Sequence, residues 1–178
     1  MPRSESEEQR LIQLVVLASD TKAFDMLVAP YAGRLRGYLL SLTRAGSDAD
    51  DLLQTTLIKA WTELHRFDER GRFVAWLFRI AHREFLQAAR SRKRYSKAMT
   101  GYGDAVVGPG IESGDGPAAE VDLTIALASL DQESCAMILL SRAVGLTHAE
   151  ISKTLEKPLG TVKSMINRAT KQLVENYG

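Results

Sequence analysis

The stretch DADDLLQTTLIKAW, residues 48–61, sets the organisation of the rest of the chain. Read at about 100° per residue, it predicts an amphipathic helix from Asp48 to about Phe67. Three aspartates fall in its first turn, where the helix dipole favours negative charge, and Ser47 or Asp48 is expected to cap it. The apolar residues that fall together on its buried side are Leu53, Leu57, Ala60 and Leu64.

The other side of this helix carries an isoleucine among polar residues. Its members are Asp48, Asp51, Thr55, Ile58 and Thr62. A purely solvated acidic face has no need of Ile58. Two interpretations follow: Ile58 packs on a neighbouring helix of the same domain, or the face is a docking surface for a basic partner protein.

Length and composition indicate a helical protein of one ordinary domain or two small ones. The chain has 178 residues, of which 45% are hydrophobic. Helical spacing of apolar residues recurs and no stretch alternates apolar and polar residues for long, so the predicted fold class is all-α. No apolar run reaches the roughly 18 residues of a membrane span, and the first ten residues do not form a secretory signal. These features predict a cytoplasmic protein.

The sequence gives no sign of an enzyme. The single cysteine, Cys135, precedes an apolar run and is expected to be buried. The three histidines, His65, His82 and His148, lie far apart, without the spacing of metal ligands. No nucleophile–base pairing or phosphate loop is visible. We therefore expect no catalytic residue, no metal and no cofactor.

Charge is segregated along the chain although the net charge is only +1. The segment RSRKRYSK, residues 90–97, holds five basic groups and no acid, whereas residues 98–121 hold four acids and no base. Residues 98–120 also contain six glycines and two prolines, which predicts a flexible linker and a domain boundary. Charge that is segregated in this way says more about binding partners than the net charge does.

Two helices are expected before the opening stretch. Residues 1–9 are polar and charged, which predicts disorder, and a first helix is expected from about Leu11. A second should begin after Asp20 and continue to about Arg44. Pro30 is expected to kink or interrupt it, because proline lacks the N–H that an internal helical position donates.

A long helix is expected from Phe73 to Arg94, after a polar turn at residues 65–72. Its predicted buried side consists of Phe73, Trp76, Leu77, Ile80 and Ala81. An arginine stripe follows its flank at Arg79, Arg83, Arg90 and Arg94. The stripe is either a solvated surface with a few salt bridges or a contact for nucleic acid, and the dense basic cluster at its end supports the second interpretation.

The C-terminal part restarts helical periodicity, with helices predicted at 121–130 and 132–144. Thr147, with Glu150 three residues later, forms a capping box for a short helix, and a tight turn leads to a final helix from Thr161. This is a helix-turn-helix pattern, in which the second helix enters the DNA major groove. The predicted outward residues of that helix are Lys163, Ser164, Asn167, Arg168 and Lys171.

Three motifs in this order resemble bacterial sigma factors of the extracytoplasmic function group. LTHAEISKTLEKPLGTVKSMINRATKQL, residues 146–173, resembles their minus-35-binding domain. DADDLLQTTLIKAW resembles their polymerase-docking helix, and FVAWLFRIAHREFLQAAR, residues 73–90, resembles the helix that reads the minus-10 element. The resemblance implies a region-two-like domain at 1–97, a linker at 98–120 and a region-four-like helix-turn-helix domain at 121–178.

The resemblance also implies partners and site residues. Core RNA polymerase would bind the acidic helix, through Asp48, Asp50, Asp51, Gln54, Thr55, Ile58 and Lys59. The minus-10 strand of promoter DNA would bind at Arg66, Phe67, Asp68, Arg70, Arg72, Arg79, Arg83, Arg90, Arg92, Lys93 and Arg94. For Phe67, a role as a core plug is the competing interpretation. The minus-35 duplex would bind at Thr161, Lys163, Ser164, Asn167, Arg168 and Lys171.

The chain departs from the family pattern at several positions. Met165 stands where the family usually has an arginine, so one minus-35 contact is expected to be missing. Arg83 and Gln87 replace a common Asn and Asp. Thr55 replaces an acid of the docking helix. We hypothesise that a Ser/Thr kinase restores negative charge at Thr55 or Thr56, unless the three aspartates suffice for docking.

The sequence alone does not decide how the protein is regulated, and it leaves one alternative function to consider. Most of the family is held inactive by an anti-sigma factor that inserts between the two domains, and no residue of this sequence proves one. The alternative function is a stand-alone dimeric helix-turn-helix regulator with an N-terminal sensor domain. That class would need symmetric operator half-sites and no polymerase. The basic segment 79–97, which would have no role in a sensor domain, favours the sigma factor.

Overall fold

The computed structural model describes residues 5–68, 71–100 and 126–177, and every regular element in these ranges is helical. The N-terminal part holds α1 (Glu5–Ala18), α2 (Thr21–Thr43), α3 (Gly46–Glu63), a 3-10 turn (Leu64–Arg66) and α4 (Phe73–Thr100). The C-terminal part holds α6 (Gln132–Arg142), α7 (His148–Leu155) and α8 (Leu159–Tyr177). Among the described helices, none combines the length and apolarity needed to cross a membrane.

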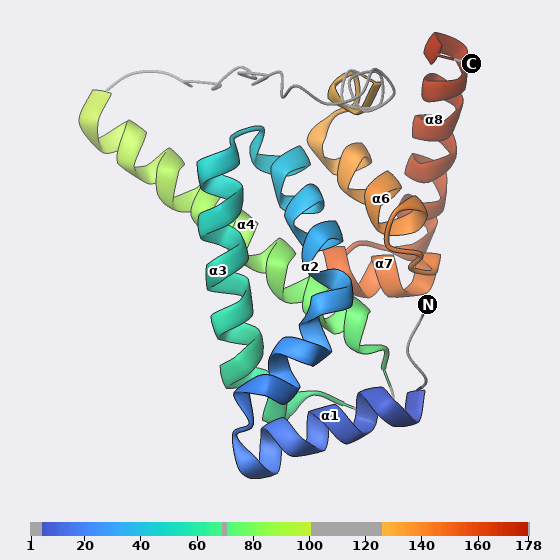
Figure 1. Ribbon diagram of the computed structural model, residues 1–178. Coiled ribbons are helices and arrows are strands. Elements are labelled where there is room, and N and C mark those ends of the chain that lie inside the picture. Colours follow the sequence, from blue (N-terminus) through green and yellow to red (C-terminus); the bar gives the residue numbers. More distant parts are fainter. Residues whose placement is uncertain (1–4, 69–70, 101–125, 178) are drawn as a thin grey trace.

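The N-terminal part is a helical unit built around α4. In Figure 1, α2 and α3 lie side by side as an antiparallel pair, α4 crosses them, and α1 covers their lower end. Phe73, Leu77 and Phe78 of α4 are fully buried between these helices. The all-α prediction is therefore confirmed, as is the predicted buried side of the long helix.

Local capping explains where the first helices begin and end. The Asp20 side chain accepts a hydrogen bond from the Ala23 amide at 3.0 Å, which caps α2. Arg44 ends α2 in a left-handed conformation, with φ 57°. Between them α2 remains one helix through Pro30 and bends near its middle (Figure 1). The expected kink is thus present, and the helix is not interrupted.

Several expected boundaries were wrong. Residues 5–9, expected to be disordered, form the first turn of α1, and Leu11, Ile12 and Val15 of that helix are buried. The helix expected from Asp48, α3, begins at Gly46, and its N-cap Ala45 makes no side-chain cap, so neither Ser47 nor Asp48 has that role. The final helix begins at Leu159, two residues before the expected start.

The buried stripe of α3 also differs from the expected one. Ala49, Leu52, Thr56 and Ala60 are buried, whereas Leu53 and Leu57 are only partly buried. The stripe is rotated by about one residue from the expected one, because α3 packs against both α2 and α4. Thr56 consequently lies inside the protein with none of its surface exposed.

The C-terminal unit has the predicted helix-turn-helix. The Thr147 hydroxyl accepts from the Glu150 amide, and the Glu150 carboxylate accepts from the Thr147 amide, so the capping box of α7 is present. Ile151 and Leu155 of α7 pack with Val162 and Ile166 of α8 in the hydrophobic core. Cys135 is buried as expected, and burial raises the pKa of its thiol to about 11. The expected linker at 98–120 lies almost wholly outside the described residues, and the expected helix at 121–130 is described only from 126.

The two units share one continuous core. α6 packs on α2, and α7 packs on α4 (Figure 1). The side-chain amide of Gln132, at the start of α6, donates to the carbonyl of Leu42 in the last turn of α2 at 2.9 Å. That carbonyl belongs to the group that a helix end leaves without an intrahelical partner, so α6 satisfies part of the end of α2.

We predict that Thr56→Val raises the free energy of unfolding by about 1 kcal/mol, because a buried hydroxyl without a partner carries a desolvation cost. Thr56 is fully buried and its hydroxyl has no hydrogen-bond partner among the described residues. Valine keeps the branched shape. Urea unfolding followed by circular dichroism measures the change.

Thr55→Val is the matched control, since the Thr55 side chain is exposed and its hydroxyl donates to the Asp51 carbonyl. It should leave the midpoint of unfolding unchanged or slightly lower. A Thr56→Val protein that is no more stable than the unaltered chain would mean that the hydroxyl has a partner.

Candidate nucleic-acid and partner interface

The outer face of α3 presents an isoleucine that none of the described residues covers. Ile58 is 65% exposed, and Asp51 and Thr55 beside it are exposed as well. The Thr55 hydroxyl donates to the Asp51 carbonyl at 2.9 Å, which is one turn back along the helix. The interpretation that Ile58 packs on another helix of its own domain is therefore wrong. Gln54 shares the exposed surface.

Two aspartates of this face already have basic partners. The Arg36 guanidinium donates to both oxygens of Asp50, at 2.7 and 3.2 Å, and Arg92 donates to Asp48. The hydrogen bond from Arg36 lowers the pKa of Asp50. Both pairs are solvent-exposed, and pairs of this kind are weak enough to exchange partners. The acidic face is therefore partly neutralised by the chain itself.

Lys59 points away from this face. Its ammonium group lies 2.6 Å from the carboxylate of Glu84, a side chain that is only 9% exposed. The pair ties α3 to α4 and satisfies the one buried acid of α4. Lys59 thus has a structural partner where the sequence suggested a surface contact.

The turn before α4 is held by an aromatic cluster. The ring of Phe67 meets those of Phe73 and Trp76 edge-on, with centroids 5.9 and 5.5 Å apart. Phe67 is partly buried against the core, which favours the plug interpretation. Arg66 and Asp68 on either side of it are exposed. Arg70 lies outside the described residues.

The arginines of α4, and Arg72 just before it, differ in what surrounds their side chains. Arg90, Arg92 and Arg94 are exposed toward the free end of the helix, as is Lys93. Arg72 and Arg83, both exposed residues, instead donate to groups of the C-terminal unit. Arg79 is only partly exposed. The structure therefore does not present the predicted stripe as one free surface.

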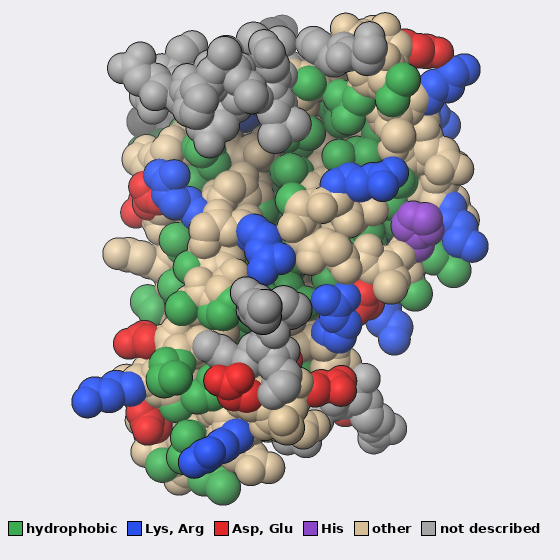
Figure 2. Space-filling model, turned by 45° about the vertical axis from the view of Figure 1, so that its right-hand side comes forward, with side chains coloured by type: hydrophobic (Ala, Val, Ile, Leu, Met, Phe, Trp, Pro, Cys, Tyr) green, Lys and Arg blue, Asp and Glu red, His purple; other side chains and the backbone are tan. Residues whose placement is uncertain are grey.

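The outer face of α8 is free. Its exposed side chains are Lys163, Ser164, Asn167, Arg168 and Lys171, whereas Thr161 is partly buried. Met165 packs partly against the core and does not extend from this face. In Figure 2, Lys and Arg side chains, with a histidine among them, line the side formed by the C-terminal helices. This surface can bind a polyanion and offers an amide that can hydrogen-bond a base edge.

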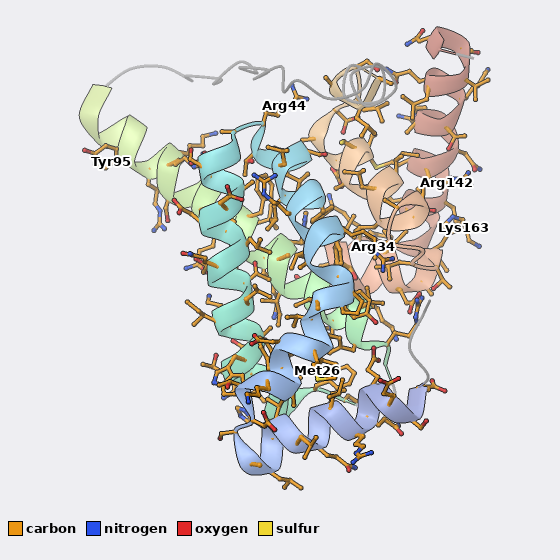
Figure 3. The ribbon with its side chains drawn as sticks, in the orientation of Figure 1. Met26, Arg34, Arg44, Tyr95, Arg142 and Lys163 are labelled. Carbon is orange, nitrogen blue, oxygen red and sulfur yellow. The ribbon has the colours of Figure 1, made fainter. Side chains whose placement is uncertain are left out.

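Two exposed residues were missed by the sequence reasoning. Arg142 ends α6, and in Figure 3 its side chain and that of Lys163 extend toward the same edge of the C-terminal unit. Tyr95 is 68% exposed within the basic end of α4 (Figure 3). An aromatic residue interleaved with basic ones is typical of single-strand binding and could have been noted in RSRKRYSK.

A histidine lies where the two units meet. His82 Nδ1 is 2.9 Å from the buried Tyr38 hydroxyl, and the same histidine lines a cleft of about 500 Å³ between α3, α4 and α7. Burial lowers the pKa of His82 to about 4, partly opposed by the carboxylates of Glu133 and Glu156. Burial also raises the pKa of Tyr38. Both side chains are therefore neutral at pH 7.

Comparison with known proteins agrees with this arrangement. Residues 27–95 match the family model described as Sigma-70 region 2, and residues 122–173 match Sigma-70, region 4. The sigma factor NccH of Alcaligenes xylosoxydans xylosoxydans is 31% identical, over 86% of each chain. The sigma factor CnrH of Cupriavidus metallidurans is 28% identical over 94% of this chain and 93% of its own.

Solved structures show the same fold. The chain is 29% identical to the sigma factor RpoE in its complex with the anti-sigma factor NepR from Bartonella quintana, with a TM-score of 0.70. That likeness covers 87% of this chain and 96% of the other. CnrH in complex with the cytosolic domain of CnrY gives a TM-score of 0.65 at 25% identity, over 96% and 94%.

The helical units and their order define a sigma-70 type transcription initiation factor, a class that binds core RNA polymerase and promoter DNA. Within that class the chain belongs to the extracytoplasmic function group. The dimeric regulator with a sensor domain is thereby excluded.

We predict that the protein loses about 2 kcal/mol of stability between pH 7 and pH 5 through His82 alone. Its pKa is about 4 in the folded state and 6.5 without the fold, so the unfolded chain binds the proton first. Stability falls as the pH drops through this window. His82→Gln should flatten the dependence, measured by urea unfolding at each pH.

The control for this experiment is His65→Gln, which changes an exposed histidine. Its curve should follow that of the unaltered chain. If His82→Gln keeps the full dependence on pH, the histidine is not buried as a neutral group.

Proposed function

We propose that this sigma factor docks on core polymerase through the outer face of α3 and reads its promoter with α4 and α8. The exposure of Ile58, at 65%, carries the docking assignment. An uncovered branched apolar side chain that shares a helix face with Asp51, two turns away, fits a partner surface that has basic groups beside an apolar pocket. Asp48, Asp50 and Asp51 would orient the complex, and Gln54 and Thr55 would lie at its edge, whereas Lys59 is left out because it pairs with Glu84.

The minus-10 element would be held by the turn before α4 and by the basic end of that helix. Arg90, Arg92, Lys93 and Arg94 would neutralise phosphates, and Tyr95 would stack on an unpaired base. Arg66, Asp68 and Arg70 would contact bases that leave the stack. Arg72, Arg79 and Arg83 would contact the minus-10 element only after the residues that now lie beside them move away.

The minus-35 element would be read by α8, whose N-terminal half lies nearest the base edges in a helix-turn-helix complex. Ser164, Asn167 and Arg168 would contact bases, with Thr161 beside them. Lys163 and Lys171 would contact phosphates, and Arg142 would extend that contact from α6. The inward packing of Met165 supports a reduced set of base contacts.

We propose two controls on this function. An anti-sigma factor would bind the chain, by analogy with the NepR complex of its structural relative. Phosphorylation would act at Thr55, which is exposed one turn after Asp51. Thr56 is removed from the earlier hypothesis because its side chain is buried and out of reach of a kinase.

We predict that Ile58→Ala weakens binding to core polymerase about tenfold, since apolar anchors at interface centres dominate binding energy. Fluorescence anisotropy of the labelled full chain measures the affinity. Leu17→Ala is the matched control, because Leu17 of α1 is 84% exposed and lies outside the proposed surface. It should bind within twofold of the unaltered chain, and equal losses in both variants would reject the α3 assignment.

We also predict that Thr55→Glu strengthens binding to a basic partner surface several-fold at low salt and that Thr55→Ala does not. The added charge is long-range and screened, so the gain should shrink as salt rises. The same anisotropy titration at two salt concentrations tests it. If Thr55→Glu, Thr55→Ala and the unaltered chain bind with the same affinity, position 55 does not contribute to docking. The aspartates alone would then form the acidic surface.

A further inference from the structure

We infer that Asp48, the first aspartate of the proposed docking face, also sets how strongly the basic end of α4 holds single-stranded DNA. Its carboxylate is the counter-ion of Arg92, so one side chain serves two binding surfaces. Both roles depend on the proposed functions of α3 and α4. Asp48 adds a direct energetic link between those functions, and the link lies wholly within the N-terminal unit.

The C-terminal half of α4 lies beyond the hydrophobic core. Apolar burial along this helix ends near Phe85, which is 5% exposed, and the side chains of residues 90–95 are all exposed. In Figure 1 this end of α4 continues past α3. Its side chains are therefore directed by charge and hydrogen bonding and not by apolar packing.

An ion pair joins this end of α4 to the start of α3. The Arg92 guanidinium donates to the carboxylate of Asp48, which lies in the first turn of α3. A second pair of opposite polarity, between Lys59 and Glu84, joins the same two helices nearer the core. Both pairs follow from the way in which α3 and α4 cross, with the start of one helix beside the end of the other.

The other two aspartates of the docking face differ from Asp48 in their partners. Asp50 accepts from Arg36 of α2, at 2.7 and 3.2 Å, and Arg36 is not assigned to DNA. Asp51 is exposed and has no basic partner among the described residues. Within the described chain, Asp48 is thus the docking aspartate that pairs with an arginine of the proposed minus-10 surface.

The chemistry of the pair links the two surfaces. A guanidinium that donates to a carboxylate has fewer N–H groups to offer a phosphate, and the carboxylate has fewer lone pairs to offer a basic group of the polymerase. A phosphate that takes Arg92 therefore releases Asp48 for docking, and a basic group that takes Asp48 releases Arg92 for DNA. By linkage, each ligand strengthens the binding of the other by the same factor.

The exposure of the pair bounds the size of this link. The side chains of Arg92 and Asp48 are 54% and 37% exposed. Exposed ion pairs are weak and are screened by salt. We therefore expect an effect of a few-fold on each affinity, which shrinks as the salt concentration rises. A pair of this strength can exchange partners, whereas a strong one would block both surfaces.

The first test measures binding of the full chain to a labelled oligothymidine single strand at low salt. Asp48→Asn should bind about twofold to fivefold more tightly, because Arg92 is released from an exposed pair. Asparagine is favoured at helix N-terminal positions, so this variant should keep α3 folded. Arg92→Gln should bind more weakly, and adding Asp48→Asn to it should bring no gain.

Asp50→Asn is the matched comparison, since it makes the same charge change beside an arginine that is not assigned to DNA. Its gain should be smaller than that of Asp48→Asn. Equal gains in the two variants, or a gain from Asp48→Asn that persists when Arg92 is glutamine, would mean general attraction to DNA and would overturn the link.

The second test measures docking on core polymerase without DNA, by anisotropy of the labelled chain. Arg92→Gln should bind about twofold to threefold more tightly at low salt, because it frees the Asp48 carboxylate. Arg10→Gln removes the same charge from an exposed site of α1, outside the proposed surfaces, and is the control. Docking of Arg92→Gln that is no tighter than docking of Arg10→Gln would reject the link.

Two further outcomes separate the link from the functions on which it depends. If Ile58→Ala docks as well as the unaltered chain, the docking role of α3 fails. If Arg92→Gln holds the single strand as tightly as the unaltered chain, the DNA-binding role of this arginine fails. In either case the link fails with the function, whereas a failed double-variant comparison with both functions intact rejects the link alone.

Discussion

The burial of one side of α4 is the constraint on which the rest of the structure depends. Phe73, Leu77, Phe78 and Ala81 have essentially no exposed surface, and α2, α3 and α7 all pack against this one helix. A helix that must bury its apolar side can present charge only on its flank and its free end. The arginines assigned to DNA therefore lie on the exposed flank and in the C-terminal part of α4, where Arg92 meets Asp48 of α3, or where α7 meets it.

The same constraint explains the outer face of α3. Because α3 packs on both α2 and α4, its apolar stripe includes Thr56 and leaves Ile58 outside. No helix of the described chain remains to cover Ile58. The proposed docking surface therefore consists of what the internal packing of α3 leaves exposed, Ile58 together with Asp51 and Thr55 on the same face.

The sequence predicted the elements well and their contacts poorly. Periodicity gave the buried side of α4, and the capping box gave the start of α7, since both depend on residues close in the chain. Which acid meets Arg72 or Arg83 depends on how two distant units pack, and no spacing encodes it. The rotation of the α3 stripe was missed for the same reason: Leu53 and Leu52 are equally apolar, and only the second neighbouring helix decides between them.

Arg83 is a residue at which the local sequence pattern and the packing of the two distant units both matter. From the sequence it is a departure from the family pattern and one member of the arginine stripe expected to contact DNA. In the structure its guanidinium is paired with the carboxylate of Glu156. A substitution that adds affinity for phosphate also adds affinity for a carboxylate of the chain itself. The net effect of Arg83 on promoter binding, in its proposed role, is then set by the balance between these two affinities.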